Sequence, residues 1–299
     1  IGLVGDKVDA LEAQLKKTMQ SALPKSLEKK QSLTLKEKRK KIAESKQQKK
    51  QVKSKNANSL SPPQSQVDKF LERYQSETYD EAKALAMSMT QQFPKHPFAW
   101  KALGAVLGQT GRNSEAVNAN QRAVALAPKD TEAHGNLGAM LQKLGRLDES
   151  ETSLRQAIAL KPGFAEAHSN LGNTLKEMGR LEDAQASYAQ AIALKPDYAE
   201  AHSNLGNTLL VLGKLNEAAA SLRQAIALKP DYAEAHYNLG ITLKDVGRLD
   251  EAEASYRQAI ALKPGFAEAH NNLGSTLQEL GRLDEAEASY TQAIVLKPG

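Results

Sequence analysis

Residues 165–198 read AEAHSNLGNTLKEMGRLEDAQASYAQAIALKPDY, and this stretch decides the fold. Its first part carries an apolar stripe at helical spacing that includes Leu171 and Leu175. Gly179 then ends the pattern, because glycine tolerates the left-handed backbone geometry that closes many helices. A second helical stripe follows, and Pro196 prevents its continuation. The stretch therefore predicts two helices joined by a turn.

The same pattern recurs along most of the chain. Prolines occur at intervals of 34 residues, at Pro94, Pro128, Pro162, Pro196, Pro230, Pro264 and Pro298. A fixed period of this size is typical of repeat arrays, in which each unit buries its apolar face by stacking on its neighbours. We expect an all-α solenoid of antiparallel helix-turn-helix hairpins over residues 63–299. Its predicted units are about 63–96, 97–130, 131–164, 165–198, 199–232, 233–266 and 267–299.

The segment before the array has a different composition. Residues 1–20 predict a short amphipathic helix, because Val4, Val8, Leu11 and Leu15 keep a coiled-coil type of spacing over about two heptads. Residues 21–62 predict a basic low-complexity arm and linker, disordered or partly helical. Because the chain begins with Ile1 and not Met, we expect it to be a fragment.

Charge and composition limit the classes of function. Residues 25–55 contain 13 Lys or Arg and 3 acidic residues, so this stretch could contact anionic surfaces nonspecifically. Specific nucleic-acid binding is not expected, because no aromatic residue that could stack on a base precedes Phe70. The chain has no Cys, which excludes disulfides and thiolate chemistry and agrees with an expected cytoplasmic location. No apolar run approaches the ~18 residues that a transmembrane helix needs.

Small residues carry the most specific signal within a unit. Gly172, Ala184 and Ala191 stand where paired helices must approach closely. At a spacing of 34 residues, this pattern of Leu, Gly, Ala and Pro resembles the tetratricopeptide repeat (TPR) family. The resemblance implies a right-handed solenoid that acts as a protein-protein interaction scaffold. Asn113 and Asn120 depart from the apolar pattern, so the hairpin that starts at Pro97 is predicted to be the weakest.

Histidine and serine recur at fixed positions of the repeat and are candidate metal ligands or nucleophiles. His134, His168, His202, His236 and His270 each come from a different unit, with no Cys or second His nearby in sequence, so we interpret them as packing residues and not as metal ligands. Ser169 and Ser203 lie inside a predicted helix without the base and oxyanion hole that a nucleophile needs, and simply occupy a variable position. We therefore predict no catalytic, cofactor or metal site in this chain.

Asparagine forms a regular ladder along the array. The ladder comprises Asn136, Asn170, Asn204, Asn238 and Asn272, each two positions after a histidine. Two positions correspond to a rotation of about 200° on a helix, so these residues should face away from the buried stripe. A ladder of Glu132, Glu166, Glu200, Glu234 and Glu268 shares their face and should make it acidic. The amides could bridge adjacent repeats, or could bind the backbone of an extended peptide.

Further positions on the same face are expected to set side-chain preference. These positions are Asn173, Asn207, Lys143, Glu177 and Asp245. In its asparagines the array is most similar to the repeat region of O-linked N-acetylglucosamine transferases and related bacterial TPR proteins, without their catalytic domain. That resemblance implies that the ladder lines the concave groove and binds peptide.

Three hypotheses of function follow. The first is a scaffold that binds a peptide or partner segment in the groove. The second is the recognition region of a larger transferase, such as a glycosyltransferase, with a catalytic domain beyond residue 299. The third is self-association through the last unit, because residues 281–297 keep the apolar face of an internal unit and lack a polar cap.

Overall fold

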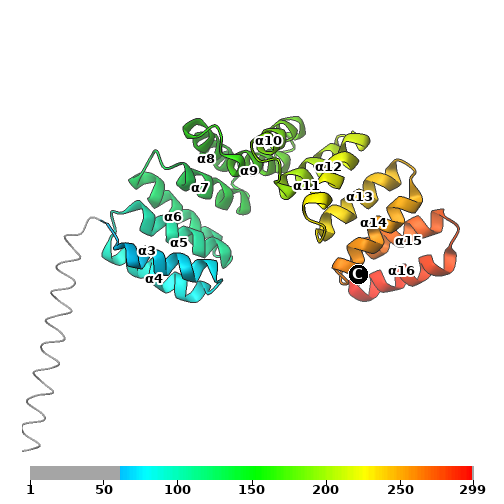
Figure 1. Ribbon diagram of the computed structural model, residues 1–299, viewed down its shortest axis with the longest axis horizontal. Helices are drawn as coiled ribbons and strands as arrows, with labels where there is room; N and C mark the ends of the chain where they lie inside the picture. Colours follow the sequence, from blue (N-terminus) through cyan, green and yellow to red (C-terminus); the bar gives the residue numbers. More distant parts are fainter. Residues whose placement is uncertain (1–60, 298–299) are drawn as a thin grey trace, which may run out of the picture. The chain divides into compact units, whose positions relative to one another are not determined.

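The computed structural model describes residues 61–297, which contain fourteen α-helices and no strand. The chain divides into two units, residues 1–61 and 62–299, and the helices belong to the second. The predicted amphipathic helix and coiled-coil spacing of residues 1–20, and the basic arm up to residue 60, lie outside the described residues. Figure 1 shows the helices following one another in sequence order. The helices are α3 (Gln64–Gln75), α4 (Tyr79–Gln92), α5 (Pro97–Gln109), α6 (Asn113–Leu126), α7 (Thr131–Lys143), α8 (Leu147–Leu160), α9 (Ala165–Glu177), α10 (Leu181–Leu194), α11 (Ala199–Val211), α12 (Leu215–Leu228), α13 (Ala233–Asp245), α14 (Leu249–Leu262), α15 (Ala267–Glu279) and α16 (Leu283–Leu296).

Each odd-numbered helix packs most extensively on the even-numbered helix that follows it. The turns of six hairpins use a glycine with positive φ, namely Gly111, Gly145, Gly179, Gly213, Gly247 and Gly281. At Gly179, φ is 76°, and the next residue, Arg180, donates its backbone N–H to the carbonyl of Leu175 at 2.9 Å. This satisfies a carbonyl at the helix end, as in a Schellman-type cap. The predicted helix stop at Gly179 is confirmed.

Small residues allow the two helices of a hairpin to approach closely. A Cβ added to Gly172 would lie 2.6 Å from the ring of Tyr188, which is fully buried. Ala184 and Ala191 are fully buried in the same hairpin. Enlarging any of these residues should therefore force apart closely packed side chains.

At two junctions, an aromatic residue at the start of the later hairpin packs on the earlier hairpin. Phe266 packs on Tyr237 of the preceding hairpin, with ring centroids 4.6 Å apart. A Cβ on Gly135 would lie 3.0 Å from the ring of Phe164. Ser169 and Ser203 occupy the position of Gly135 in their own helices and are buried. Our description of these serines as residues at a merely variable position was incomplete, because the position lies against the next hairpin.

Consecutive hairpins thus bury a series of apolar clusters, in which most of the buried residues are Ala and Leu. Each odd-numbered helix from α5 onward also contacts the even-numbered helix before it, and successive odd-numbered helices of α5 to α15 touch one another. This is the packing of a TPR-type solenoid, and the predicted fold class is confirmed.

Candidate functional site

The recurrent histidines have a structural role in the described array. Each is half-buried, and its Nε2 lies 3.0–3.4 Å from the carbonyl oxygen of the proline six residues earlier. Trp100 occupies the equivalent position in α5 and donates its Nε1–H to the carbonyl of Pro94 at 2.8 Å. Residues 61–297 contain no group of three or more His, Cys, Asp or Glu that could hold a metal ion. The histidines thus tie α7, α9, α11, α13 and α15 each to the loop before it.

The asparagine ladder lies on the odd-numbered helices, with every member half-buried. We call this surface, formed by the five ladder residues with Asn173 and Asn207, the asparagine face. The side-chain amides of Asn136, Asn170 and Asn238 make no hydrogen bond with any described residue. Each of these amides can therefore donate and accept hydrogen bonds toward a ligand.

Two ladder residues bridge adjacent hairpins instead. Asn204 Nδ2 donates to Asn173 Oδ1 at 3.1 Å, and Asn272 Nδ2 donates to the hydroxyl of Tyr237 at 3.1 Å. The same Asn173 oxygen accepts the hydroxyl of Tyr188 at 2.6 Å. Burial raises the pKa of Tyr188, so its phenol stays protonated and donates this bond. Some members of the ladder thus bridge adjacent hairpins, whereas others keep a free amide.

Asn207 differs from Asn173, although it holds the same position one hairpin later. The residue that faces its helix from α12 is Leu222, which packs on Gly206 and has no hydroxyl to donate. The amide of Asn207 makes no hydrogen bond within residues 61–297. It therefore joins Asn136, Asn170 and Asn238 as a free amide of the asparagine face.

The glutamate ladder does not leave this face strongly acidic. Each glutamate is exposed and has a lysine partner; Lys263 Nζ, for example, lies 3.1 Å from Glu234 Oε1. This ion pair and hydrogen bond lower the pKa of Glu234. The other pairs are Glu132 with Lys101, Glu166 with Lys195, Glu200 with Lys229 and Glu268 with Lys297. We expected the glutamates to make this face acidic, and the structure corrects that expectation, because the paired lysines offset the negative charge of the glutamates.

The remaining predicted positions lie near the ends of the odd-numbered helices. Lys143 and Asp245 are exposed and make no ion pair with a described residue. Glu177 is also exposed, and it accepts a hydrogen bond from Gln142 of the preceding odd-numbered helix. Free charges of both signs therefore remain along the asparagine face.

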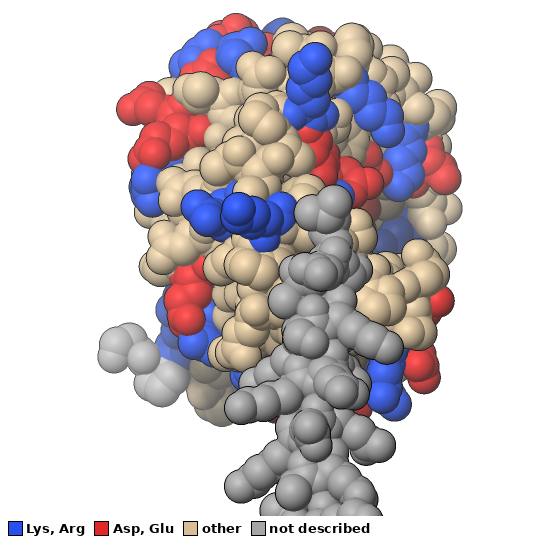
Figure 2. All heavy atoms as spheres, turned by 90° about the vertical axis from the view of Figure 1, so that its left-hand side faces the viewer, with Lys and Arg blue, Asp and Glu red and all other residues tan. Residues whose placement is uncertain are grey.

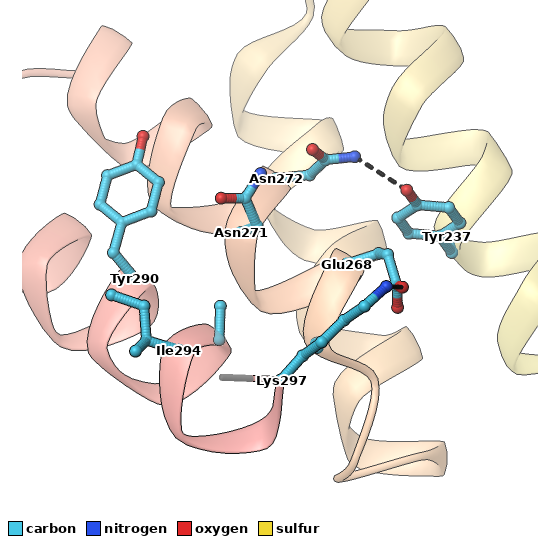
Figure 3. Close-up of a pocket in the computed structure, with 9 residues that line it drawn as sticks. Tyr237, Glu268, Asn271, Asn272, Tyr290, Ile294 and Lys297 are labelled. Carbon is cyan, nitrogen blue, oxygen red and sulfur yellow. Dashed lines mark hydrogen bonds and ion pairs between the residues drawn. The ribbon is translucent and has the colours of Figure 1, made fainter. Parts of the chain in front are cut away.

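A pocket of about 490 Å³ lies at the end of the described array, between α15 and α16 and beside α13. Figure 3 shows Tyr290 and Ile294 of α16 on one side of it and Asn271 and Asn272 of α15 on the other. Asn271 holds the position that Tyr237 holds one hairpin earlier, where Phe266 packs. Ile294 is 65% exposed, which leaves an apolar surface at this end. The predicted self-association through the last unit stays a prediction.

Two family models match the sequence. One, described as "TPR repeat", matches residues 140–179, 172–212 and 206–247, and the other, described as "Tetratricopeptide repeat", matches residues 237–299. Together they span residues 140–299, more than half of the chain. This chain belongs to the tetratricopeptide repeat family. No curated protein matches the sequence.

Solved structures of other TPR proteins have the same fold. MamA is 28% identical, with a TM-score of 0.51 over 54% of this chain and 94% of its own. YrrB is 23% identical, with a TM-score of 0.52 over 61% of this chain and 94% of its own. PilF of Pseudomonas aeruginosa is 21% identical, with a TM-score of 0.62 over 68% of this chain and 92% of its own. At these identities YrrB and PilF show the fold alone.

The surface of the TPR array carries both charges. Basic and acidic side chains are interspersed on the face in Figure 2, where neither sign forms a continuous field over the described residues. Among the described helices, none is long and apolar enough to cross a bilayer. Sequence reasoning did not identify Tyr188 and Tyr237 as partners of the asparagine face, or Gln142 as the partner of Glu177. Only the recurrence of a Tyr or Leu at the position of Tyr188 could have signalled that the hairpins differ there.

Proposed function

We propose that this TPR array is a scaffold that binds an extended peptide, or an extended segment of a partner protein, along the asparagine face. The observation that carries the proposal is the set of free amides at Asn136, Asn170, Asn207 and Asn238, one on each of four successive odd-numbered helices. An amide can donate to a peptide carbonyl and accept from a peptide N–H. A regular row of amides suits a ligand held mainly by its backbone.

The fold and the resemblances support this proposal. YrrB, which shares the fold, is described as a TPR protein with an unusual peptide-binding site. The likeness of the asparagines to those of O-linked N-acetylglucosamine transferase repeats also favours peptide binding. The comparisons give no support to the hypothesis of a larger enzyme. A cytoplasmic location and nonspecific anionic contact through residues 25–55 stay predictions.

The test separates free amides from bridging ones. A displayed library of random 12-residue peptides is selected on the full chain, and the enriched peptides are synthesised. Replacing Asn136, Asn170 and Asn238 together by Ala should weaken their binding about tenfold or more, since each lost hydrogen bond contributes about 0.5–1.5 kcal/mol. The melting temperature should hardly change, because these amides have no partner in the fold.

The matched control is Asn204→Ala, which breaks the bond to Asn173. It should lower stability more than any single replacement of a free amide. Failure of the library to yield any enriched peptide, or equal binding by the triple variant and the native chain, would overturn the proposal.

A further inference from the structure

A register between successive odd-numbered helices recurs along the array. At two junctions the twelfth residue of one odd-numbered helix binds the residue 35 positions later on the next, and at one of them it also binds the residue 31 positions later. Lys244 Nζ lies 2.6 Å from Ser275 Oγ and 3.0 Å from Glu279 Oε1. Gln142 makes the equivalent hydrogen bond to Glu177. In both places the later helix supplies a carboxylate at the second position.

The junction between α9 and α11 lacks this carboxylate. Lys176 holds the twelfth position of α9, and the residues 31 and 35 positions later are Asn207 and Val211. Val211 is 63% exposed and offers no acceptor. Lys176 is half-buried and makes no hydrogen bond or ion pair with residues 61–297. Its ammonium is therefore partly removed from water without a partner.

Burial lowers the pKa of Lys176, because partial removal from water disfavours the charged ammonium. The one acidic group that opposes this effect is Glu177, and the carboxylate of Glu177 already accepts a hydrogen bond from Gln142. A carboxylate brought by a ligand would give Lys176 a charge-assisted hydrogen bond in a site partly shielded from solvent. The free amide of Asn207 could donate to the same group.

Apolar side chains continue from this position along the next junction. Leu210 holds the twelfth position of α11, and the residue 31 positions later is Ile241. Both are half-buried, and Leu210 directly precedes the exposed Val211 in sequence. One lysine and one amide match a singly charged carboxylate better than a phosphate, which calls for several cations.

We propose that the junction of α9 and α11 is a subsite for a carboxylate followed by an apolar side chain in the bound segment. Lys176 and Asn207 bind the carboxylate, while Val211, Leu210 and Ile241 contact the apolar group. This inference rests on the proposed function, since it names the side chains that the asparagine face selects. The carboxylate can belong to Asp or Glu, or to the free C-terminus of the segment.

The test uses the same 12-residue library on the full chain, displayed once with free C-termini and once with C-termini fused to the carrier. We expect an acidic residue followed by an apolar residue to be enriched in the fused library, or C-terminal apolar residues in the free library. Replacing the enriched Asp or Glu by its amide, or amidating the enriched C-terminus, should weaken binding about tenfold. In Lys176→Met, replacing the acidic residue by its amide or amidating the C-terminus should weaken binding less than about twofold. The reason is that no cation is then present to distinguish the charged ligand from the neutral one.

Three further variants sharpen the result. Val211→Glu places a carboxylate 35 positions after Lys176, as Glu279 follows Lys244, and should abolish the acidic preference by occupying the subsite from within. Val211→Gln provides the neutral match and should keep that preference. Lys244→Met, at an ion-paired lysine, should also leave the preference unchanged.

The outcomes distinguish this inference from the proposal beneath it. Enriched peptides without any carboxylate preference overturn the subsite and leave the peptide-binding scaffold standing. A preference that persists in Lys176→Met overturns it as well. If the library yields no binders, both fail together.

Discussion

The buried amide of Asn120 gives the array a specific weakness. Asn120 is fully buried on α6, and neither its oxygen nor its nitrogen has a hydrogen-bond partner. It faces α5 closely, since a Cβ on Gly104 would lie 2.2 Å from Asn120 Oδ1. Leu154 holds the same position in the next hairpin, fully buried against Gly138 at a similar distance of 2.5 Å. The replacement Asn120→Leu therefore copies a contact that the array already makes.

The expected gain follows from three contributions. Removing an unsatisfied buried amide recovers about 1–3 kcal/mol. Burying a leucine side chain instead contributes a further ~1.5–3 kcal/mol. Misfit in a site shaped around a smaller residue can cost ~1–3 kcal/mol. We expect a net stabilisation of about 2 kcal/mol.

Native-state hydrogen exchange is the appropriate assay, because a repeat array can open hairpin by hairpin. A gain of about 2 kcal/mol should slow exchange of the α5 and α6 amides roughly 30-fold. Asn120→Ala removes the polar atoms without filling the site and should gain less. Leu154→Asn should destabilise its own hairpin. Faster exchange of α5 and α6 in Asn120→Leu would refute the reasoning, since it would mean that the amide is satisfied or that the site rejects leucine.

Three more predictions concern other parts of the array. His202→Ala should lower stability by about 0.5–1.5 kcal/mol through loss of its bond to Pro196, whereas His202→Trp should lose less, as Trp100 makes the same bond; urea unfolding measures both. Burial lowers the pKa of His96 in the folded chain below its ordinary 6.5. The stability contributed by the neutral ring is therefore complete above pH 6.5 and is lost as the pH falls through the folded pKa. Melting temperatures at pH 7.5 and 5.5 should thus differ more in the native chain than in His96→Gln, and equal differences would contradict this. Light scattering should show mass rising with concentration if the last hairpin self-associates, and Ile294→Glu should then abolish the rise.

The prediction of the fold rested on local backbone chemistry. The sequence showed the helix stop at Gly179 and the small residue at Gly172 directly, because both act within one hairpin. It also showed the interval between prolines, which repeats once per hairpin. The role of the histidines was predicted only in part. Packing was expected from their place on the helical stripe, but the bond from each ring to a proline carbonyl depends on how the loop folds back.

The chemistry of the asparagine face needed the tertiary structure. Residues 169–175 and 203–209 both read SNLGNTL, so no local pattern separates Asn173 from Asn207. Yet Asn173 accepts bonds from Tyr188 and Asn204, while Asn207 stays free opposite Leu222.

The sequence alone therefore determined the repeat, the ends of its helices and the recurrence of asparagine at one position of the odd-numbered helices. Only the tertiary structure decided which amides and which lysine remain available to a ligand. The physical reason is that a side chain's hydrogen-bonding capacity is used or left free by groups 15 to 35 residues away, on the paired helix and on the next hairpin.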